Sequence, residues 1–570
     1  MKAFSKILLL VILMSAAACL PTATQPPEAS NTATQALAPT QAIPGPTSQP
    51  TPDEPVSTAE PPTSFWWNDT IFYEIFVRSF KDSDGDGIGD LNGLIEMLDY
   101  LNDGDPDTDT DLGITGIWLM PVNPSPSYHG YDVIDYYEIN QEYGTKEDFK
   151  RLMEEAHQRG IKVIIDLVIN HTGRDHPWFQ ASQAGDPQYR DWYMWRDEHP
   201  GFLSPWGQPA WHRAGDSYYY GIFWDGMPDL NLENPEVTEA IYDVTRYWLE
   251  EMGVDGFRMD AIRHLIEKGP LQENTSATHA WLQAYYLFYK SVNPQAFTVG
   301  EAWTSTRQII DYIGDEVDIA FEFDLAQAFL VAAKNPVVAA LNVQAKKVLD
   351  SYPEGQYGVF LTNHDQNRVM FELREEKIAK LAATMMLTFP GVPFIYYGEE
   401  IGMIGSKPDE DIRLPMQWSG ESGAGFTSGT PWREPYPDYP DRNVSVQSDD
   451  PDSLLSHYRS LTGLRNRHAA LRSGGAILVN SGSPSLYALL RYNDDEAFLV
   501  LVNSHPNEVT ADRYGLTLET GPFEGALQAE TALGVADAAA PIINAQGGFE
   551  NYRPFEIIPG QSSLIVRLAP

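Results

Sequence analysis

The sequence predicts an α/β fold: a (β/α)8 TIM barrel with an inserted domain after its third strand and an all-β sandwich domain at the C-terminal end. Three observations predict it. Eight short apolar segments alternate with helix-sized intervals between residues 71 and 397. Ionisable residues follow several of these segments, and such barrels carry their active sites at the carboxyl ends of the strands. Beyond residue 471, short alternating segments separated by turn residues are typical of antiparallel sheets.

The eight expected strands are continuous apolar runs, as buried parallel strands are. They are 71–77, 114–119, 161–169, 253–259, 297–300, 317–323, 357–361 and 391–397. A helical pattern occupies 146–159, and another at 454–471 is the expected last helix before the C-terminal strands. Those strands include 486–492, 497–502 and 563–568.

The predicted organisation has five parts. They are a lipoprotein-type signal peptide (1–18), a Pro- and Thr-rich tether (19–63), the barrel (64–171 and 226–471), the insertion (172–225) and a C-terminal β domain (472–570). The insertion is too long for an ordinary loop between a strand and a helix. It is rich in tryptophan, and for any single one of these side chains the insertion's own core is the expected place.

The net charge of the chain disfavours one class of binding partner, nucleic acids. The 570 residues include 80 acidic and 38 basic ones, for a formal net charge of -42. Nucleic-acid binding needs clustered Lys and Arg, so this balance disfavours it. The charge fits a neutral substrate, bound cations or a salty environment, and for most of these residues solubility is a sufficient role.

The N-terminal residues predict export. Lys2 and Lys6 precede an apolar run at 7–14, and small residues then lead to Cys19, the single cysteine of the chain. This resembles a bacterial lipoprotein signal with Cys19 as the lipidated residue, although Ala16 stands where leucine is usual. Residues 20–63 cannot bury enough apolar surface to fold and predict a semi-extended tether. We therefore expect a protein anchored to the membrane through Cys19, with full secretion as the alternative.

A cluster of acidic residues after the first strand predicts a Ca²⁺ site. Oxygen donors occupy alternate positions, with Gly87 at the sixth, as a calcium loop requires. Gly93 stands where an EF-hand would have its glutamate, so the loop is not an EF-hand. The alternative, a solvent-exposed acidic loop, is disfavoured because the aspartates would repel one another without a cation. The predicted ligands are Asp82, Asp84, Asp86, the Ile88 carbonyl and Asp90.

Three expected strands end in carboxylates: Asp260, Glu301 and Asp365. Arg258 lies two residues before Asp260, so both side chains face the same way in a strand and the arginine should keep Asp260 ionised. A purely structural ion pair is the alternative. Two carboxyl groups, one ionised and one carrying a proton, are the minimum for cleaving a glycosidic bond with retention.

Short motifs around these carboxylates resemble the alpha-amylase family, glycoside hydrolase family 13, from residue 65 to the C-terminus. The motifs are 166–171 (DLVINH), 227–231 (MPDLN), 256–260 (GFRMD), 300–303 (GEAW), 363–365 (NHD) and 391–398 (GVPFIYYG). The resemblance implies that Asp260 is the nucleophile, Glu301 the acid/base and Asp365 the stabiliser of the transition state. It implies substrate contacts from His129, Tyr131, His171, Arg258, His264 and His364, and a second calcium at Asn170. Tryptophan faces of the insertion could also stack on sugar rings.

The motifs lean towards different members of that family. The calcium loop and the segments 413–418 and 425–432 resemble exo-acting glucosidases, whereas Tyr128 and Ala261 resemble endo-acting enzymes that cleave α-1,4 bonds. The mixture resembles the intermediate subfamily between alpha-amylases and oligo-1,6-glucosidases. We expect a monomeric, retaining, endo-acting alpha-amylase for starch and maltooligosaccharides. An exo-acting α-glucosidase, oligo-1,6-glucosidase or transglycosylase is the alternative. A non-catalytic glycan-binding protein is disfavoured because all three carboxylates are present.

Overall fold

The computed structural model describes residues 65–534 and 536–570. The predicted signal peptide, Cys19 and the tether lie outside this range. Within it, no helix combines the length and the apolar character needed to cross a membrane.

Eight parallel strands form a closed barrel, as the sequence predicted. They are β1 (Phe72–Ile75), β2 (Gly116–Leu119), β3 (Lys162–Leu167), β7 (Gly256–Met259), β8 (Phe297–Gly300), β9 (Ile319–Ala320), β10 (Gly358–Val359) and β11 (Val392–Tyr396). Their order is β10-β11-β1-β2-β3-β7-β8-β9, and a parallel bridge between Phe321 and Gly358 joins β9 to β10. All residues of these strands except Lys162 are buried, which explains their continuous apolar sequences.

Several strands are shorter than their apolar segments. The segment 71–77 passes directly into α1 (Val77–Phe80), and 317–323 ends where α9 (Phe323–Lys334) begins. In the segment 253–259, Gly253 adopts a φ of +76° and belongs to the preceding turn. Gly253 is exposed, but the residues that end the other two segments, 76–77 and 321–323, are buried like the strands, so hydrophobicity does not mark where those two strands end.

Helices follow the strands and cover the barrel. The 13-residue helix α4 (Lys146–Gln158) begins at Thr145, which shares a capping box with Asp148. The predicted helix at 454–471 is two helices, α15 (Leu454–Arg467) and α16 (Ala469–Arg472), separated at His468. The remaining helices of this region are α2 (Leu91–Glu96), α3 (Leu98–Leu101), α6 (Pro235–Arg246), α7 (Ser276–Val292), α8 (Thr306–Ile309), α10 (Ala339–Ser351), α11 (Val369–Leu373), α12 (Glu376–Thr388), α13 (Asp409–Ile412) and α14 (Val444–Ser448).

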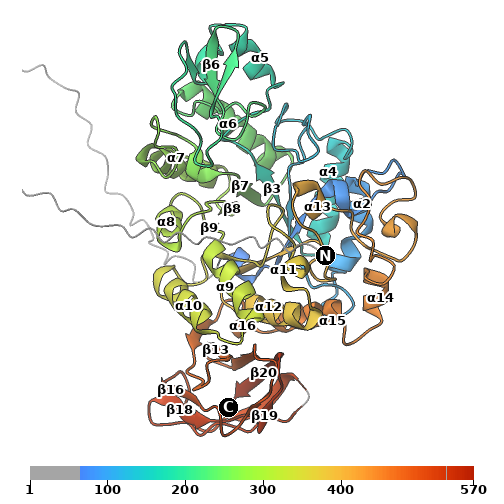
Figure 1. Ribbon diagram of the computed structural model, residues 1–570, viewed down its shortest axis with the longest axis vertical. Helices are drawn as coiled ribbons and strands as arrows, with labels where there is room; N and C mark the ends of the chain where they lie inside the picture. The colour runs from blue at the N-terminus through green and yellow to red at the C-terminus, as the bar shows by residue number, and fades with distance from the viewer. Residues whose placement is uncertain (1–64, 535) are drawn as a thin grey trace, which may run out of the picture. The chain divides into compact units, whose positions relative to one another are not determined.

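The insertion after β3 has its own small antiparallel sheet. It contains α5 (Pro177–Gln183), β4 (Trp195–Arg196), β5 (Trp211–Ala214) and β6 (Ser217–Tyr220), with β6 in the middle of the sheet. Figure 1 shows α5 and β6 together in one lobe near α6. The tryptophans differ in burial. Trp192 and Trp211 are buried as expected of core residues, Trp178 and Trp195 are half-buried, and Trp206 and Trp224 are 48% and 46% exposed.

The C-terminal region is an antiparallel β domain, as predicted. Its main sheet has the order β12-β13-β14-β20-β17, and two further pairs are β15–β19 and β16–β18, with the bounds of each strand given at the end of this paragraph. On β14, Leu499 and Leu501 belong to this domain's own core, whereas Val500 and Val502 join the core that contains the barrel. Both faces of β14 are therefore covered. The strands are β12 (Gly475–Leu478), β13 (Leu486–Tyr492), β14 (Ala497–Asn503), β15 (Val509–Thr510), β16 (Leu516–Thr520), β17 (Gln528–Leu533), β18 (Gly547–Tyr552), β19 (Ile557–Ile558) and β20 (Ser562–Ala569).

Candidate active site

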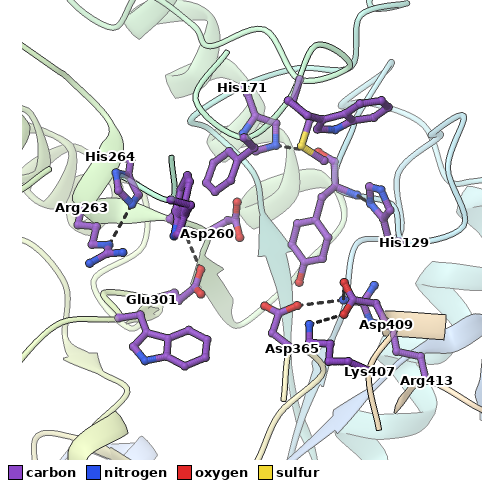
Figure 2. Close-up of a pocket in the computed structure, with 17 residues that line it drawn as sticks. His129, His171, Asp260, Arg263, His264, Glu301, Asp365, Lys407, Asp409 and Arg413 are labelled. Atoms are coloured by element: carbon purple, nitrogen blue, oxygen red, sulfur yellow. Dashed lines mark hydrogen bonds and ion pairs between the residues drawn. The ribbon is translucent and has the colours of Figure 1, made fainter. Parts of the chain in front are cut away.

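A pocket of about 750 Å³ lies at the carboxyl ends of the barrel strands. Asp260 follows β7, Glu301 follows β8, and Asp365 lies in the turn after β10. Figure 2 shows these three carboxylates around one space. Four other predicted residues also line the pocket: His129, Tyr131, His171 and His264. Arg258 and His364 are not in its lining, because both are buried beneath it.

A strained turn directs two of the carboxylates. Ala261 adopts φ 49° and ψ 35°, the left-handed conformation that costs a non-glycine residue roughly 1–2 kcal/mol. The turn ends β7 and leads into a short 3-10 helix, Ile262–His264. It leaves Asp260 on the pocket wall and lets the Ala261 N–H donate to Oε2 of Glu301 at 3.1 Å. The residue after Asp260 therefore also orients Glu301.

One buried arginine serves three carboxylates. Nη1 of Arg258 lies 2.7 Å from Oδ1 of Asp166 and 2.7 Å from Oδ1 of Asp260. Nη2 lies 2.7 Å from Oε2 of Glu301. The sequence predicted only the pair with Asp260, because that pair is local and the other two cross between strands. One positive charge thus faces three negative ones.

The excess of carboxylates over arginine around Asp260 affects the pKa of its side chain. Burial and the negative charges of Glu301, Asp166 and Asp365 outweigh Arg258 and raise the pKa of Asp260 to about 8. Burial and the neighbouring anions therefore oppose the ionisation of Asp260 that Arg258 favours, and the predicted role of Arg258 stays a prediction. Asp260 and Glu301 contact the same guanidinium group.

Asp365 has the opposite environment. Its Oδ2 lies 3.2 Å from Nε2 of His364, and its Oδ1 accepts a hydrogen bond from Nη2 of Arg413 at 2.9 Å. Although burial opposes ionisation, these two cations hold the pKa of Asp365 well below its usual range. In return, Asp365 and Glu74 overcome the burial of His364 and raise its pKa to about 9. The surroundings thus raise the pKa of Asp260 and lower that of Asp365, so the environment separates these two carboxyl groups.

The other pocket histidines are neutral. Burial lowers the pKa of His171 and of His264 to about 4, and it lowers the pKa of His129 as well. Nε2 of His171 donates to the Tyr131 carbonyl at 3.2 Å, and Nδ1 of His264 donates to the Gln272 carbonyl at 2.8 Å. The second nitrogen of each ring accepts, Nδ1 of His171 from the Asn170 amide at 3.4 Å and Nε2 of His264 from Nε of Arg263 at 2.9 Å. Neutral imidazoles line the pocket without adding charge to it.

Some pocket residues were not predicted as site residues. Arg413 had a signal, since it begins the segment 413–418, but Lys407 and Asp409 follow no pattern in the sequence. Figure 2 shows these three grouped beyond Asp365. On the other side, Trp303 is 45% exposed and stacks on Phe323 with ring centroids 4.6 Å apart. The further lining residues are Trp206, Phe223, Trp224, Met227, Ala261 and Arg263.

The sequence of this chain matches a known family of enzymes. The family model described as "Alpha amylase, catalytic domain" matches residues 74–474. The chain belongs to the alpha-amylase family. It is 39% identical over 454 residues to "Alpha-amylase 3" of Dictyoglomus thermophilum, an alignment that covers 78% of this chain and 86% of that protein. The predicted resemblance to glycoside hydrolase family 13 is thereby confirmed.

Other members of the alpha-amylase family are similar over the same range. An oligo-1,6-glucosidase of Heyndrickxia coagulans is 34% identical over 529 residues, covering 79% of this chain and 94% of that protein. The crystal structure of an alpha-amylase from H. orenii superposes with a TM-score of 0.77 at 40% identity, covering 87% of this chain and 99% of that one. The family is therefore clear, whereas the named activities of these relatives differ.

This alpha-amylase family member has the donor atoms of a calcium site near β1. Carboxylate oxygens of Asp82, Asp84 and Asp86 lie within 4.8 Å of one another. The Asp82 carboxylate also accepts hydrogen bonds from the Gly85 and Gly87 N–H groups, which fold the loop around it. Such an all-oxygen set fits Ca²⁺. These three residues, with the Ile88 carbonyl that the loop spacing predicts as a further ligand, would hold the ion.

Asp90 has a different place from the three clustered aspartates. Its Oδ1 accepts from the Gly93 N–H at 2.8 Å and caps helix α2, and its Oδ2 accepts from the Ser83 N–H at 2.7 Å. The ninth position of the loop coincides with the start of a helix, whose first N–H groups need an acceptor. Asp90 closes the loop, and its role as a ligand stays a prediction.

Asn170, predicted as a ligand of a second calcium, lies at the boundary of barrel and insertion. Its Oδ1 is buried and accepts no hydrogen bond from the described residues, and the same is true of Asp229 Oδ2 and Glu267 Oε1. Burial raises the pKa of Asp229 to about 7. Three buried oxygen atoms without donors are compatible with a hard cation. The second calcium also stays a prediction.

Removing calcium should destabilise the protein. An ion bound only by the folded state adds about 2.7 kcal/mol when its concentration is 100 times its Kd. We expect EDTA to lower the melting temperature measured by calorimetry, and the variant Asp84→Asn/Asp86→Asn to lose this response. Asp494→Asn/Asp495→Asn is the matched control, because these two exposed aspartates lie in the turn between β13 and β14, away from the calcium loop. A melting temperature that ignores both EDTA and added calcium would contradict the site.

Proposed function

We propose that the protein is a calcium-binding, retaining, endo-acting alpha-amylase that cleaves α-1,4-glucosidic bonds in starch and maltooligosaccharides. The observation that carries the proposal is the arrangement of Asp260, Glu301 and Asp365 around one pocket, with Asp260 and Glu301 on one arginine and Asp365 held ionised by two cations. Retaining hydrolysis needs two carboxyl groups on the same glycosidic bond, one as nucleophile and one as proton donor.

In the first half of the reaction, Glu301 donates a proton to the glycosidic oxygen while Asp260 attacks the anomeric carbon, giving a glycosyl-enzyme and a released sugar. Positive charge developing at that carbon favours the anion of Asp260, so Asp260 attacks as a carboxylate. Glu301 then takes a proton from water, which attacks the anomeric carbon and frees Asp260.

Asp365 contributes a charge that does not move. His364 and Arg413 keep it ionised throughout the cycle, so it can stabilise the oxocarbenium-like transition state without exchanging a proton. The neutral histidines His129 and His171 and the hydroxyl of Tyr131 supply hydrogen bonds for the bound sugar. The exposed face of Trp303 lies on the same wall as Glu301, where the leaving sugar would stack.

The endo-acting mode rests on Tyr128. This residue carries no charge where exo-acting relatives have an aspartate, and its ring stacks on Trp432 with centroids 5.6 Å apart. An exo-acting glucosidase is the second candidate. It is favoured by the similarity to oligo-1,6-glucosidases and by the ion pair of Lys407 with Asp409, which adds charge to the pocket wall.

A maltoheptaoside blocked at its non-reducing end separates the two modes. An endo-acting enzyme should cleave the blocked and the free substrate at rates within about threefold of each other, since neither end enters the site. Chromatography of the products checks this. Cleavage of the free substrate alone would contradict the endo-acting mode and favour the exo-acting glucosidase. Isomaltose and pullulan serve as controls for α-1,6 cleavage.

The proposal includes export, with attachment to the membrane through Cys19 and full secretion as the alternative. It is supported by the basic start, the apolar run at 7–14 and the small residues before Cys19. Fractionation of cells into membrane and medium tests it, and protein found only in the cytoplasm would contradict it.

A further inference from the structure

A buried carboxylate lies behind His364, on the side away from the pocket. Glu74, in the middle of β1, is 2% exposed, and its Oε1 lies 2.5 Å from Nδ1 of His364. The other ring nitrogen, Nε2, lies 2.7 Å from the Tyr131 hydroxyl and 3.2 Å from Oδ2 of Asp365. His364 thus connects a carboxylate that cannot reach a substrate with one that faces it.

With Glu74 ionised, the hydrogen bonds around His364 fit a doubly protonated ring. Burial raises the pKa of Glu74, whereas His364 and Arg258 favour its anion. As a carboxylate Glu74 can only accept, so Nδ1 carries the proton of this hydrogen bond. The Tyr131 hydroxyl donates to Oδ2 of Asp166 at 3.0 Å, so its oxygen accepts from Nε2. Both nitrogens are therefore donors, and the ring is a cation. Among the described residues, the Glu74 side chain has no hydrogen-bond partner other than His364.

We propose that Glu74 is a positioning residue of the reaction, which keeps His364 cationic and aims its Nε2 at Asp365 and Tyr131. This inference rests on the proposed function. Without Glu74, Asp365 would be the one carboxylate of the described residues in ion-pair contact with a fully buried imidazolium, whereas burial favours the neutral ring. Glu74 supplies the second anion without occupying space in the pocket. A carboxylate behind a histidine orients the ring and stabilises its cation in the same way in other enzymes.

Charged groups from several elements act on His364. The carboxylates favour the cation, and two arginines oppose it: Arg258 beneath the pocket, and Arg413, whose Nε donates to the His364 carbonyl at 3.0 Å. The Trp118 ring meets the imidazole edge-on with centroids 5.6 Å apart and adds no charge. The groups are Glu74 from β1, Tyr131 from the loop after β2, Asp166 from β3, Arg258 from β7, Asp365 from the turn after β10 and Arg413 from the loop after α13.

Replacing Glu74 by Gln tests the role through the pH profile. Glutamine can still accept from Nδ1 but has no charge, so the pKa of His364 falls and the cation is lost at a lower pH. We expect the alkaline limb of kcat to move down by about one pH unit or more, with KM changed less than about threefold. At about pH 5.5, where the ring is protonated in both proteins, kcat should differ by less than about fivefold.

Glu400→Gln is the matched control for Glu74→Gln. Glu400 is also a buried carboxylate, but its hydrogen bonds come from the Tyr73 and Tyr100 hydroxyls and not from the site. It should leave the pH profile in place. A Glu74→Gln profile that superposes on that of the wild type, or one lowered equally at every pH, would overturn the proposal.

The titration of His364 in the wild-type protein gives a readout that depends neither on folding of the variant nor on activity. NMR of ¹³C-labelled histidine, with the signal assigned by its loss in His364→Asn, should show a ring that stays protonated above about pH 8. A ring that is neutral at pH 7 would overturn the proposal. A wild-type protein inactive on α-glucans would instead contradict the proposed function and leave this titration unaffected.

Discussion

Replacing Asp260 by Asn should lower kcat on starch by about 10⁴- to 10⁶-fold, as loss of a nucleophile does in enzymes with covalent intermediates. The amide has the size of the carboxyl group but cannot attack the anomeric carbon. Because the loss falls on bond formation to the enzyme, it should be equally severe on starch and on an activated aryl maltotrioside. Steady-state kinetics on both substrates measure it.

Glu301→Gln is the informative partner of this experiment. It removes the proton donor but keeps the nucleophile, so an aryl leaving group that needs no proton should recover part of the first step. Asp260→Asn should show no such recovery. Turnover of Asp260→Asn above about one per cent of the wild type would contradict its assignment as nucleophile.

The variant Asp260→Asn should be at least as stable as the wild type. The folded-state pKa of Asp260 is raised above its unfolded value, so this carboxyl group favours the folded state below the unfolded pKa and loses that contribution as pH rises through about 8. At neutral pH an uncharged amide avoids that loss. The melting temperature of Asp260→Asn at pH 7 should therefore equal or exceed that of the wild type.

Replacing Arg258 by Met should have the largest effect on stability. It leaves Asp166, Asp260 and Glu301 without their shared cation in a buried site, and breaking a buried ion pair by removing one partner costs about 3–5 kcal/mol. Urea unfolding should show a loss of at least this size. The cost should be largest near pH 8 and smaller near pH 5, because the unpaired carboxyl groups take up protons as the pH falls.

Arg246→Met is the control for this experiment. Arg246 and Asp243 also form an ion pair, but their side chains are 42% and 62% exposed, so its loss should cost less than about 1 kcal/mol. A loss in Arg258→Met that is the same at every pH would show that packing of the arginine side chain, and not its charge, stabilises the site.

Much of the barrel could be predicted because its strands are covered on both faces. Segments such as 161–169 and 391–397 are continuous apolar runs for that reason, and the carboxylates that end strands are visible as breaks in such runs. Strand ends in a parallel barrel meet at one face. Hence Asp260, Glu301 and Asp365 could be brought together before any coordinates were known.

The electrostatics of the site could not be predicted in this way. Arg258 lies two residues from Asp260 but 43 from Glu301 and 92 from Asp166 along the chain, and the sharing of its charge depends on distances across three strands. Lys407 and Asp409 enter the pocket from a loop without a pattern. Asp90 has the spacing of a calcium ligand, yet the helix that starts there uses its carboxylate as a cap.

The sequence by itself determined the order of the strands, the three carboxylates and the family, because these follow from local apolar runs and from motifs that stand at strand ends. Only the tertiary structure decided that the pKa of Asp260 is raised and that of Asp365 lowered, that Glu74 lies behind His364, and which tryptophans face the pocket. The physical reason is that burial and charge act through space. A pKa depends on every charge within a few ångströms, whatever its distance along the chain.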